Sequence, residues 1–400
     1  MPSTVNALKI FLLGTIIRSL AVPLRLPIYR QEFGDWDSVI VAPMKADGQS
    51  LSLLVDTGSS EVFFVEKKYL ERAFSPGACE DFLFGCYECP AGPCRGEVSR
   101  IEHCDDTCAY TVQHRGTVEF GGRVTPDVDF GLVVGYTPND STPHASLGLA
   151  PRDDGGPTPL IDQLIDKGVI NRPDFSIYFK PDNPNEGELI LGGEDPSKYR
   201  GPMMIVPLAR RDTWTVKLAR VEVGGRSVIE SIPMDIDSGT SYLWLPLGLY
   251  TILRMALEKS ASEAAGRNIK LRFDGRVLAL RNCSDRDYLP PLEMHFLDKV
   301  GGVSTIVIPP ELYVQTSSSS QSRACILLWQ MELLQTRDRP TLGLNLLRKY
   351  YLHFRHSERE IRFAEAARTH EPMKAATNDQ KRRRRMSSWT ALDLASLSIS

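Results

Sequence analysis

The chain has 400 residues, of which 42% are hydrophobic and 24% are charged, and its 50 acidic and 47 basic side chains leave a net charge of −3. This length favours two domains or one large bilobed unit with a sizeable core, and the composition excludes a mostly disordered protein. The near-neutral charge balance gives no reason to expect nucleic acid as a partner.

The N-terminus has the features of a secretory signal peptide. Lys9 precedes an apolar run at 10–17, and Ser19 to Ala21 form a small-x-small cleavage pattern. We therefore expect residues 1–21 to be removed, and the protein to be secreted or delivered to an endosomal or lysosomal type of compartment. A buried N-terminal strand or helix is the alternative. No later segment is long and apolar enough to be expected to span a membrane.

Eight cysteines fall into a cluster of six and a later pair: Cys79, Cys86, Cys89, Cys94, Cys104 and Cys108, then Cys283 and Cys325. An even number of cysteines behind a signal peptide favours disulfides, and a zinc site in the cluster is the alternative. Glycosylation sequons at Asn139 and Asn282 agree with secretion. The pairing within the first cluster stays open.

From about Trp36 onward, short apolar runs alternate with turn residues, which predicts a mostly β chain. The expected strands include 39–43, 51–55, 116–124, 130–134, 175–179 and 188–191. Apolar residues have helical spacing at 160–167 and, more loosely, at 250–265. Helices are therefore expected to be few.

One short sequence occurs twice in the chain. VDTGSS at 55–60 returns as IDSGTS at 236–241, and each copy has apolar runs before and after it. An apolar-apolar-Gly element follows in each half, at 146–150 and at 341–344. The sequence therefore predicts two related lobes, each carrying one acidic loop.

The repeat also sets the expected domain boundaries. We predict an N-terminal lobe at 22–200 and a C-terminal lobe at 201–366, with the join between 195 and 207, where Pro and Gly cluster. Residues 367–400 are polar, then basic at 381–385, then Ser-rich, which predicts a disordered, solvated tail.

Each acidic loop can position one carboxylate. Asp56 and Asp237 end apolar runs, and the glycine two positions later allows a sharp turn that brings its N–H close to the carboxylate. Two carboxylates held face to face cannot both ionise freely, so they share a proton. One can then activate a water as general base while the other protonates the carbonyl oxygen of a peptide. This chemistry needs no metal or other cofactor, and none is expected, since the seven histidines show no metal-ligand spacing.

These motifs resemble those of the pepsin family of aspartic endopeptidases over about residues 24–366. LGGED at 191–195 followed by YRG at 199–201 looks like the end of the family's first lobe, and TLGLNLLRKYY at 341–351, with EIRFA at 360–364, resembles its C-terminal signature. The resemblance implies a mostly β, bilobed fold whose cleft binds extended peptide or protein substrates through main-chain hydrogen bonds. We expect a monomer with no nucleic-acid partner and no membrane span.

The resemblance also implies roles for the loop residues. Asp56 and Asp237 would be the catalytic pair, and Thr57 and Ser238 would bond across the lobes beneath the two carboxylates. It further implies that Cys283 and Cys325 are bonded to each other.

Other residues are expected to support the pair and to bind substrate. Ser59 and Thr240 would hydrogen-bond the outer carboxylate oxygens, and Gly58 and Gly239 would face the substrate backbone. Tyr110 is the candidate for the tyrosine that the family carries on a hairpin over its cleft, with an ordinary strand tyrosine as the alternative.

The chain also departs from the family pattern. Phe63 stands where a tryptophan is common, Leu344 replaces a common aspartate, and the cysteine-rich stretch is longer than in pepsin. A pepsin-like peptide-binding protein that has lost catalysis is therefore the alternative function. The stretch 36–55 is needed for the first strands of the lobe, which leaves too few residues after position 21 for a full inhibitory pro-segment. We therefore expect a protein that starts at Val22 to be active without removal of a large pro-segment.

Overall fold

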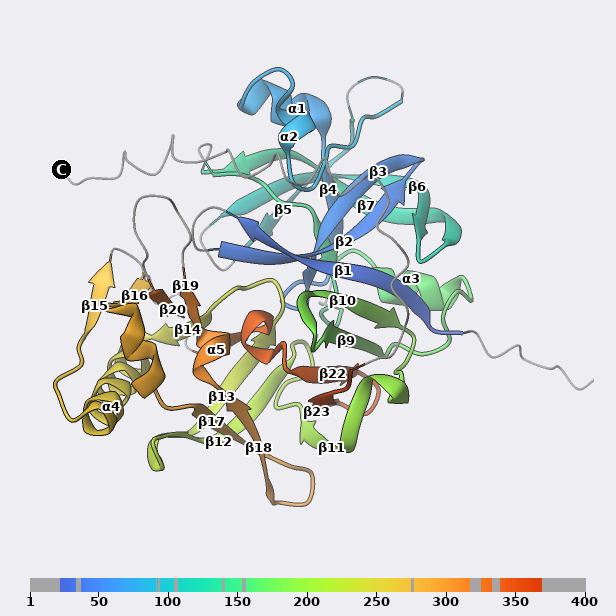
Figure 1. The fold of residues 1–400 in the computed structure, drawn as a ribbon. Helices are drawn as coiled ribbons and strands as arrows, with labels where there is room; N and C mark the ends of the chain where they lie inside the picture. Colours follow the sequence, from blue (N-terminus) through green and yellow to red (C-terminus); the bar gives the residue numbers. More distant parts are fainter. Residues whose placement is uncertain are drawn as a thin grey trace, which may run out of the picture.

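The computed structural model describes residues 22–33, 37–90, 92, 94–103, 107–138, 141–152, 156–274, 277–316, 325–332 and 339–368. The expected signal peptide, Cys104, Asn139 and residues 369–400 of the expected tail lie outside the described residues. Within them, the strands form two large β-sheets, and the prediction of a mostly β, bilobed pepsin-like fold is confirmed (Figure 1).

The first sheet has thirteen strands among the described residues, in the order β11-β23-β22-β9-β10-β1-β2-β3-β8-β4-β7-β6-β5. Their bounds are β1 Leu24–Phe33, β2 Asp37–Ala46, β3 Gln49–Asp56, β4 Val62–Val65, β5 Val98–Glu102, β6 Cys108–Phe120, β7 Arg123–Thr137, β8 Ser146–Gly148, β9 Phe175–Lys180, β10 Asn183–Leu191, β11 Tyr199–Pro207, β22 Tyr350–Arg355 and β23 Glu360–Ala366. Strands from the end of the chain thus complete a sheet that begins at its start.

The second sheet has ten strands in the same described ranges, in the order β15-β16-β20-β14-β21-β13-β12-β17-β18, with β19 paired to β20. Their bounds are β12 Thr215–Val223, β13 Arg226–Asp237, β14 Leu243–Pro246, β15 Leu271–Asp274, β16 Val277–Leu280, β17 Leu292–Leu297, β18 Val303–Ile308, β19 Val314–Thr316, β20 Cys325–Glu332 and β21 Thr341–Gly343. Buried apolar side chains of both sheets form one continuous core that includes Val55 and Ile236, the residues before the two aspartates.

Helices are short and few in the described ranges. They are α1 Lys67–Ala73, α2 Ala78–Asp81, α3 Leu160–Asp166, α4 Leu247–Ala265 and α5 Pro310–Tyr313, with 3-10 turns η1 Pro196–Lys198, η2 Cys283–Tyr288 and η3 Leu344–Leu347. The helices predicted at 160–167 and 250–265 correspond to α3 and α4. Even α4, the longest of them at 19 residues, is not apolar enough to cross a membrane.

One predicted strand is wrong. Residues 116–124 are not a single strand, because β6 ends at Phe120 and β7 begins at Arg123. Gly121 and Gly122 both have positive φ, 56° and 74°, which is the backbone of a two-residue hairpin turn of the primed type. The apolar alternation continues across the turn, so it conceals the reversal of the chain.

The chain ends of the described part are tied together. β23 pairs with β11 and β22, and β22 pairs with β9. Ala367, the first residue of the expected tail, is buried, and its N–H donates to the carbonyl oxygen of Lys198 at 2.8 Å. That residue therefore belongs to the folded part of the chain.

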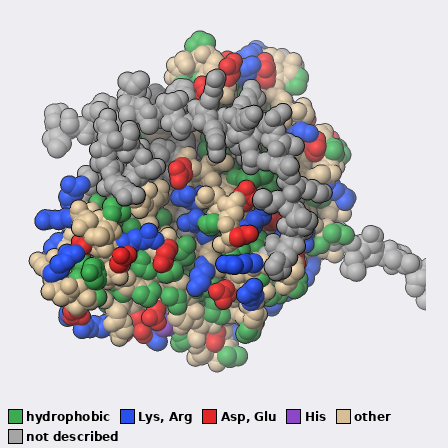
Figure 2. Space-filling model, in the orientation of Figure 1, with side chains coloured by type: hydrophobic (Ala, Val, Ile, Leu, Met, Phe, Trp, Pro, Cys, Tyr) green, Lys and Arg blue, Asp and Glu red, His purple; other side chains and the backbone are tan. Residues whose placement is uncertain are grey.

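On the coloured part of the face in Figure 2, acidic and basic side chains are interspersed, in agreement with the small net charge.

Glu360 opens β23 as a buried carboxylate with three cationic partners. Arg355 Nη1 lies 2.8 Å and Arg362 Nη2 lies 2.7 Å from its Oε1, and Lys299 contacts its Oε2. Burial alone would raise the pKa of Glu360, but the hydrogen bonds from these three side chains outweigh it and lower the pKa below its usual value. The folded protein therefore favours the ionised form.

Glu360→Gln is expected to destabilise the fold in a pH-dependent way. Because the pKa of Glu360 is lower in the folded state, its ion pairs stabilise the fold above the unfolded-state pKa of about 4.3, and this contribution is lost as pH falls through the folded-state pKa. Urea unfolding should show a loss of about 2–3 kcal/mol at pH 6 and a smaller loss at pH 3. The control is Glu358→Gln, an exposed partner of Arg355, which should change stability by less than about 1 kcal/mol. Equal losses for Glu360→Gln at both pH values would contradict this expectation.

Three disulfides are present among the described residues: Cys79–Cys86, Cys89–Cys94 and Cys283–Cys325. The first two close short loops beside α1 and α2, and the third has the partners that the family resemblance implies. Cys108 is buried and free. Four of the six cysteines of the first cluster thus form disulfides, which the sequence favours over a zinc site.

Loss of the Cys283–Cys325 bond is expected to be costly. Its sequence separation is 42, and a closed loop of this size restricts the unfolded chain strongly. The double variant Cys283→Ser/Cys325→Ser should lose about 3–4 kcal/mol of unfolding free energy in the chain-entropy model. Denaturant unfolding of both proteins under non-reducing conditions measures this difference. An unchanged midpoint would contradict the expectation.

Candidate active site

The two repeated loops begin at equivalent places in the two sheets. β3 runs parallel to β8 with Asp56 opposite Gly148, and β13 runs parallel to β21 with Asp237 opposite Gly343. The strand after each loop, β4 or β14, pairs antiparallel with the same β8 or β21. The sequence repeat is therefore also a repeat of local topology.

Each loop holds its own carboxylate. The N–H of Gly58 donates to Asp56 Oδ1 at 2.8 Å, and the N–H of Gly239 donates to Asp237 Oδ1 at 2.8 Å. Asp56 is buried and Asp237 is half-buried. Both side chains are thus oriented by the turn that the motif encodes, as expected from the glycine two positions after each aspartate.

The two loops interlock across the lobes. The N–H of Thr57 donates to Ser238 Oγ and the N–H of Ser238 donates to Thr57 Oγ1, both at 2.9 Å. The two hydroxyls then donate onward, Thr57 to the carbonyl of Ile236 at 3.0 Å and Ser238 to the carbonyl of Val55 at 2.7 Å. Each hydroxyl thus accepts one hydrogen bond and donates another, and these bonds hold the two loops in a fixed position relative to each other.

The interlock places each carboxylate against the opposite loop. A Cβ atom built on Gly58 would lie 2.7 Å from Asp237 Oδ2, and one built on Gly239 would lie 2.5 Å from Asp56 Oδ1. Only a residue without a side chain leaves room for the carboxylates at these positions. The structure therefore brings Asp56, Asp237, Gly58 and Gly239 into one small cluster.

The outer hydroxyls of the loops have other contacts. Ser59 Oγ lies 3.4 Å from Ser146 Oγ, and Thr240 Oγ1 accepts a hydrogen bond from Trp244 Nε1 at 2.6 Å. Their expected bonds to the outer carboxylate oxygens remain predictions. Sequence reasoning missed Ser146 and Trp244. Trp244 occupies the same position after the second motif as Phe63 does after the first, so the repeat itself was a signal that could have found it.

Tyr110 is half-buried in β6, opposite Arg100 of β5 and Gly135 of β7. Residues 104–106, which connect β5 to β6, lie outside the described residues, so the role of Tyr110 stays a prediction. Phe63 is fully buried, with its ring 6.2 Å from that of His103 at the start of this connection.

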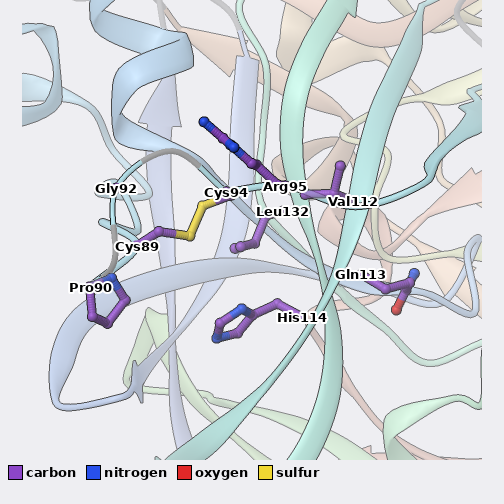
Figure 3. Close-up of a pocket in the computed structure, with 9 residues that line it drawn as sticks. All are labelled: Cys89, Pro90, Gly92, Cys94, Arg95, Val112, Gln113, His114 and Leu132. Atoms are coloured by element: carbon purple, nitrogen blue, oxygen red, sulfur yellow. A yellow bond between two sulfur atoms is a disulfide. The ribbon is translucent and has the colours of Figure 1, made fainter.

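A cavity of about 180 Å³ lies elsewhere, beside the Cys89–Cys94 disulfide. His114, Leu132 and Arg95 are among its lining residues, and Figure 3 shows them around the disulfide. The two aspartates are not among the residues that line it.

A group of three side chains that could bind a metal lies on the second sheet. It consists of Glu222 of β12 and of Glu293 and His295 of β17. Asp56 and Asp237 lie on other strands, at the ends of β3 and β13.

Comparison with known proteins agrees with this geometry. Residues 45–366 match the family model described as eukaryotic aspartyl protease. Renin-2 of Mus musculus is 26% identical over 54% of this chain and 51% of its own length. Secreted aspartic protease 8 of Candida albicans is 26% identical over 48% of this chain and 49% of its own length. Candidapepsin-3 of the same species is 24% identical over 80% of this chain and 77% of its own length. The chain spans about half the length of the first of these relatives.

The family match covers most of the chain and includes both repeated loops. The chain belongs to the eukaryotic aspartyl protease family.

Proposed function

We propose that this protein is an aspartic endopeptidase in which Asp56 and Asp237 hydrolyse peptide bonds of extended peptide or protein substrates. The observation that supports this most is the interlock of the two loops, which sets each carboxylate against the glycine of the other loop. This arrangement supports the proposal that the two carboxylates share one proton, as general acid–base catalysis by the pair requires.

In the proposed reaction, the ionised carboxylate removes a proton from a bound water, whose oxygen attacks the peptide carbonyl carbon. The protonated carboxyl donates its proton to the carbonyl oxygen, which gives a neutral tetrahedral intermediate. The carboxyl that took the proton from water then transfers it to the nitrogen, while the other carboxylate, now ionised, takes a proton from one hydroxyl of the intermediate. The C–N bond breaks, and an amine and a carboxylic acid are released. Thr57 and Ser238 position the loops, and Ser59 and Thr240 are proposed to orient the outer oxygens.

The remaining parts of the proposal concern substrate binding and context. Gly58, Gly239 and Tyr110 are proposed to contact the substrate. The lobes are proposed to comprise 22–200 and 201–366, with the protein acting as a monomer after entering the secretory pathway. The secreted relative from Candida albicans supports that destination.

The test is cleavage of denatured haemoglobin by the purified protein across pH 3 to 8, with and without pepstatin. We expect cleavage to be greatest at acid pH and to be blocked by pepstatin, because the mechanism needs one proton on the pair. Binding of peptides without cleavage at any pH would favour the alternative of a catalytically impaired binding protein.

A further inference from the structure

A second cluster of chemically reactive side chains lies on β12, β17 and β18, which are adjacent in Figure 1 at the end of the molecule opposite β3. The register places Glu222 of β12 opposite Glu293 of β17, and His295 of β17 opposite Thr305 of β18. Glu293 and His295 are two residues apart on one strand, so their side chains share a face of the sheet.

The three side chains converge. One carboxylate oxygen of Glu222, one of Glu293 and one imidazole nitrogen of His295 all lie within 4.8 Å of one another. A divalent ion at the centre of such a triangle would reach all three atoms at ordinary bond lengths of about 2.0–2.2 Å after small side-chain movements.

The surroundings of His295 also point to a metal ion, independently of the convergence of the three side chains. Its side chain is only 8% exposed, and its Nε2 has no hydrogen-bond partner although it lies 3.5 Å from Glu222 Oε1. Thr305 Oγ1 lies 2.8 Å from Nδ1, where it can accept a hydrogen bond from the Nδ1–H group of the tautomer that leaves a lone pair on Nε2. Ligating histidines usually have their other ring nitrogen held in this way. A buried nitrogen without a partner is costly, and a metal ion would satisfy it.

We propose that Glu222, Glu293 and His295 form a binding site for a divalent transition-metal ion, with Zn²⁺ as the best-suited ion. One imidazole and two carboxylates match the ligand preferences of zinc, and the two carboxylates balance its charge. Calcium and magnesium prefer sites made of oxygen ligands only, which His295 does not provide. The ion would link β12 to β17 and stabilise the second sheet.

The guanidinium of Arg220 would compete with the metal ion for the carboxylate of Glu222. Its Nε donates to Glu222 Oε1 at 2.5 Å, and its side chain is 38% exposed. An incoming cation must therefore displace this guanidinium into solvent. Removal of Arg220 should strengthen metal binding, which is the opposite of what removal of a ligand should do.

The experiment measures Zn²⁺ binding to the purified full-length protein by equilibrium dialysis and calorimetry at neutral pH, with Ca²⁺ as the comparison ion. We expect one Zn²⁺ per chain, with Glu293→Gln and His295→Gln each weakening binding at least about tenfold. Arg220→Met should strengthen it several-fold. Glu263→Gln, an exposed carboxylate on α4, is the matched control and should leave binding unchanged.

Zinc should also raise the melting temperature of the wild type and not that of Glu293→Gln. Glu293 is partly exposed, so this variant should fold even if the buried His295 variant does not. Equal affinity in wild type and Glu293→Gln overturns the proposal, as does zinc binding that is lost in Asp237→Asn and kept in Glu293→Gln. The absence of stoichiometric binding to the wild type also overturns it. None of these outcomes depends on peptidase activity.

Discussion

Asp56→Asn and Asp237→Asn are each expected to lower the rate of peptide hydrolysis by about 10³-fold or more while leaving the protein folded. Neither carboxylate can replace the other, because the reaction needs one ionised and one protonated group at the same time. An asparagine amide can neither take a proton from water nor donate an acidic one. Its oxygen can still accept the N–H of Gly58 or Gly239, so the turns should survive.

The measurement is kcat/KM on a peptide substrate at acid pH, together with thermal unfolding of each variant. The matched control is Asp166→Asn at the exposed end of α3, which should retain wild-type activity and stability. A single variant of the pair with near wild-type turnover would refute the assignment of Asp56 and Asp237. A variant that fails to fold would be excluded by its melting curve before its activity is interpreted.

Gly239→Ala and Gly58→Ala are the substitutions with the next largest expected effect. The new Cβ would lie 2.5 Å from Asp56 Oδ1 in the first variant and 2.7 Å from Asp237 Oδ2 in the second, well inside van der Waals contact. The carboxylate must therefore move away from its partner. A displacement of about 1 Å in a catalytic group can cost about 10²-fold in rate, and we expect at least this loss of kcat.

The backbone at both glycines has no positive φ, so the added methyl group acts through the carboxylate contact and not through backbone strain. Gly248→Ala is the matched control, since a Cβ there meets no atom within 4 Å and Gly248 lies within α4. It should keep full activity and gain up to about 1 kcal/mol of stability, because alanine favours the helix. Wild-type kcat in Gly239→Ala would show that catalysis does not depend on the carboxylate position that this glycine permits.

The local part of the candidate site could be predicted from the sequence. The Asp-x-Gly spacing of both motifs encodes a turn whose glycine N–H reaches the aspartate two residues earlier, and both turns form this bond. The duplication also predicted two related lobes, and the pairing of β3 with β8 and of β13 with β21 repeats in register. These features depend on neighbouring residues or on whole repeated segments, which a sequence displays directly.

Predictions from local sequence patterns failed where the same pattern is compatible with two different structures. The apolar alternation at 116–124 fits a strand, but the positive φ of Gly121 and Gly122 reverses the chain in its middle. The first cysteine cluster likewise left several pairings open, since six cysteines allow fifteen connectivities. The observed bonds Cys79–Cys86 and Cys89–Cys94 required the folded positions of α1, α2 and the loop that follows them.

By itself, the sequence determined that this protein is mostly β, that it contains two equivalent acidic loops, and that those loops place Asp56 and Asp237 at strand ends. Only the tertiary structure decided which side chains meet across strands, such as Glu222 of β12 with Glu293 and His295 of β17. Such contacts depend on the register between strands that are distant in the chain, and a shift of one residue would turn every side chain to the other face of the sheet. The free energy that selects one register is summed over the whole core, so no short stretch of sequence carries it.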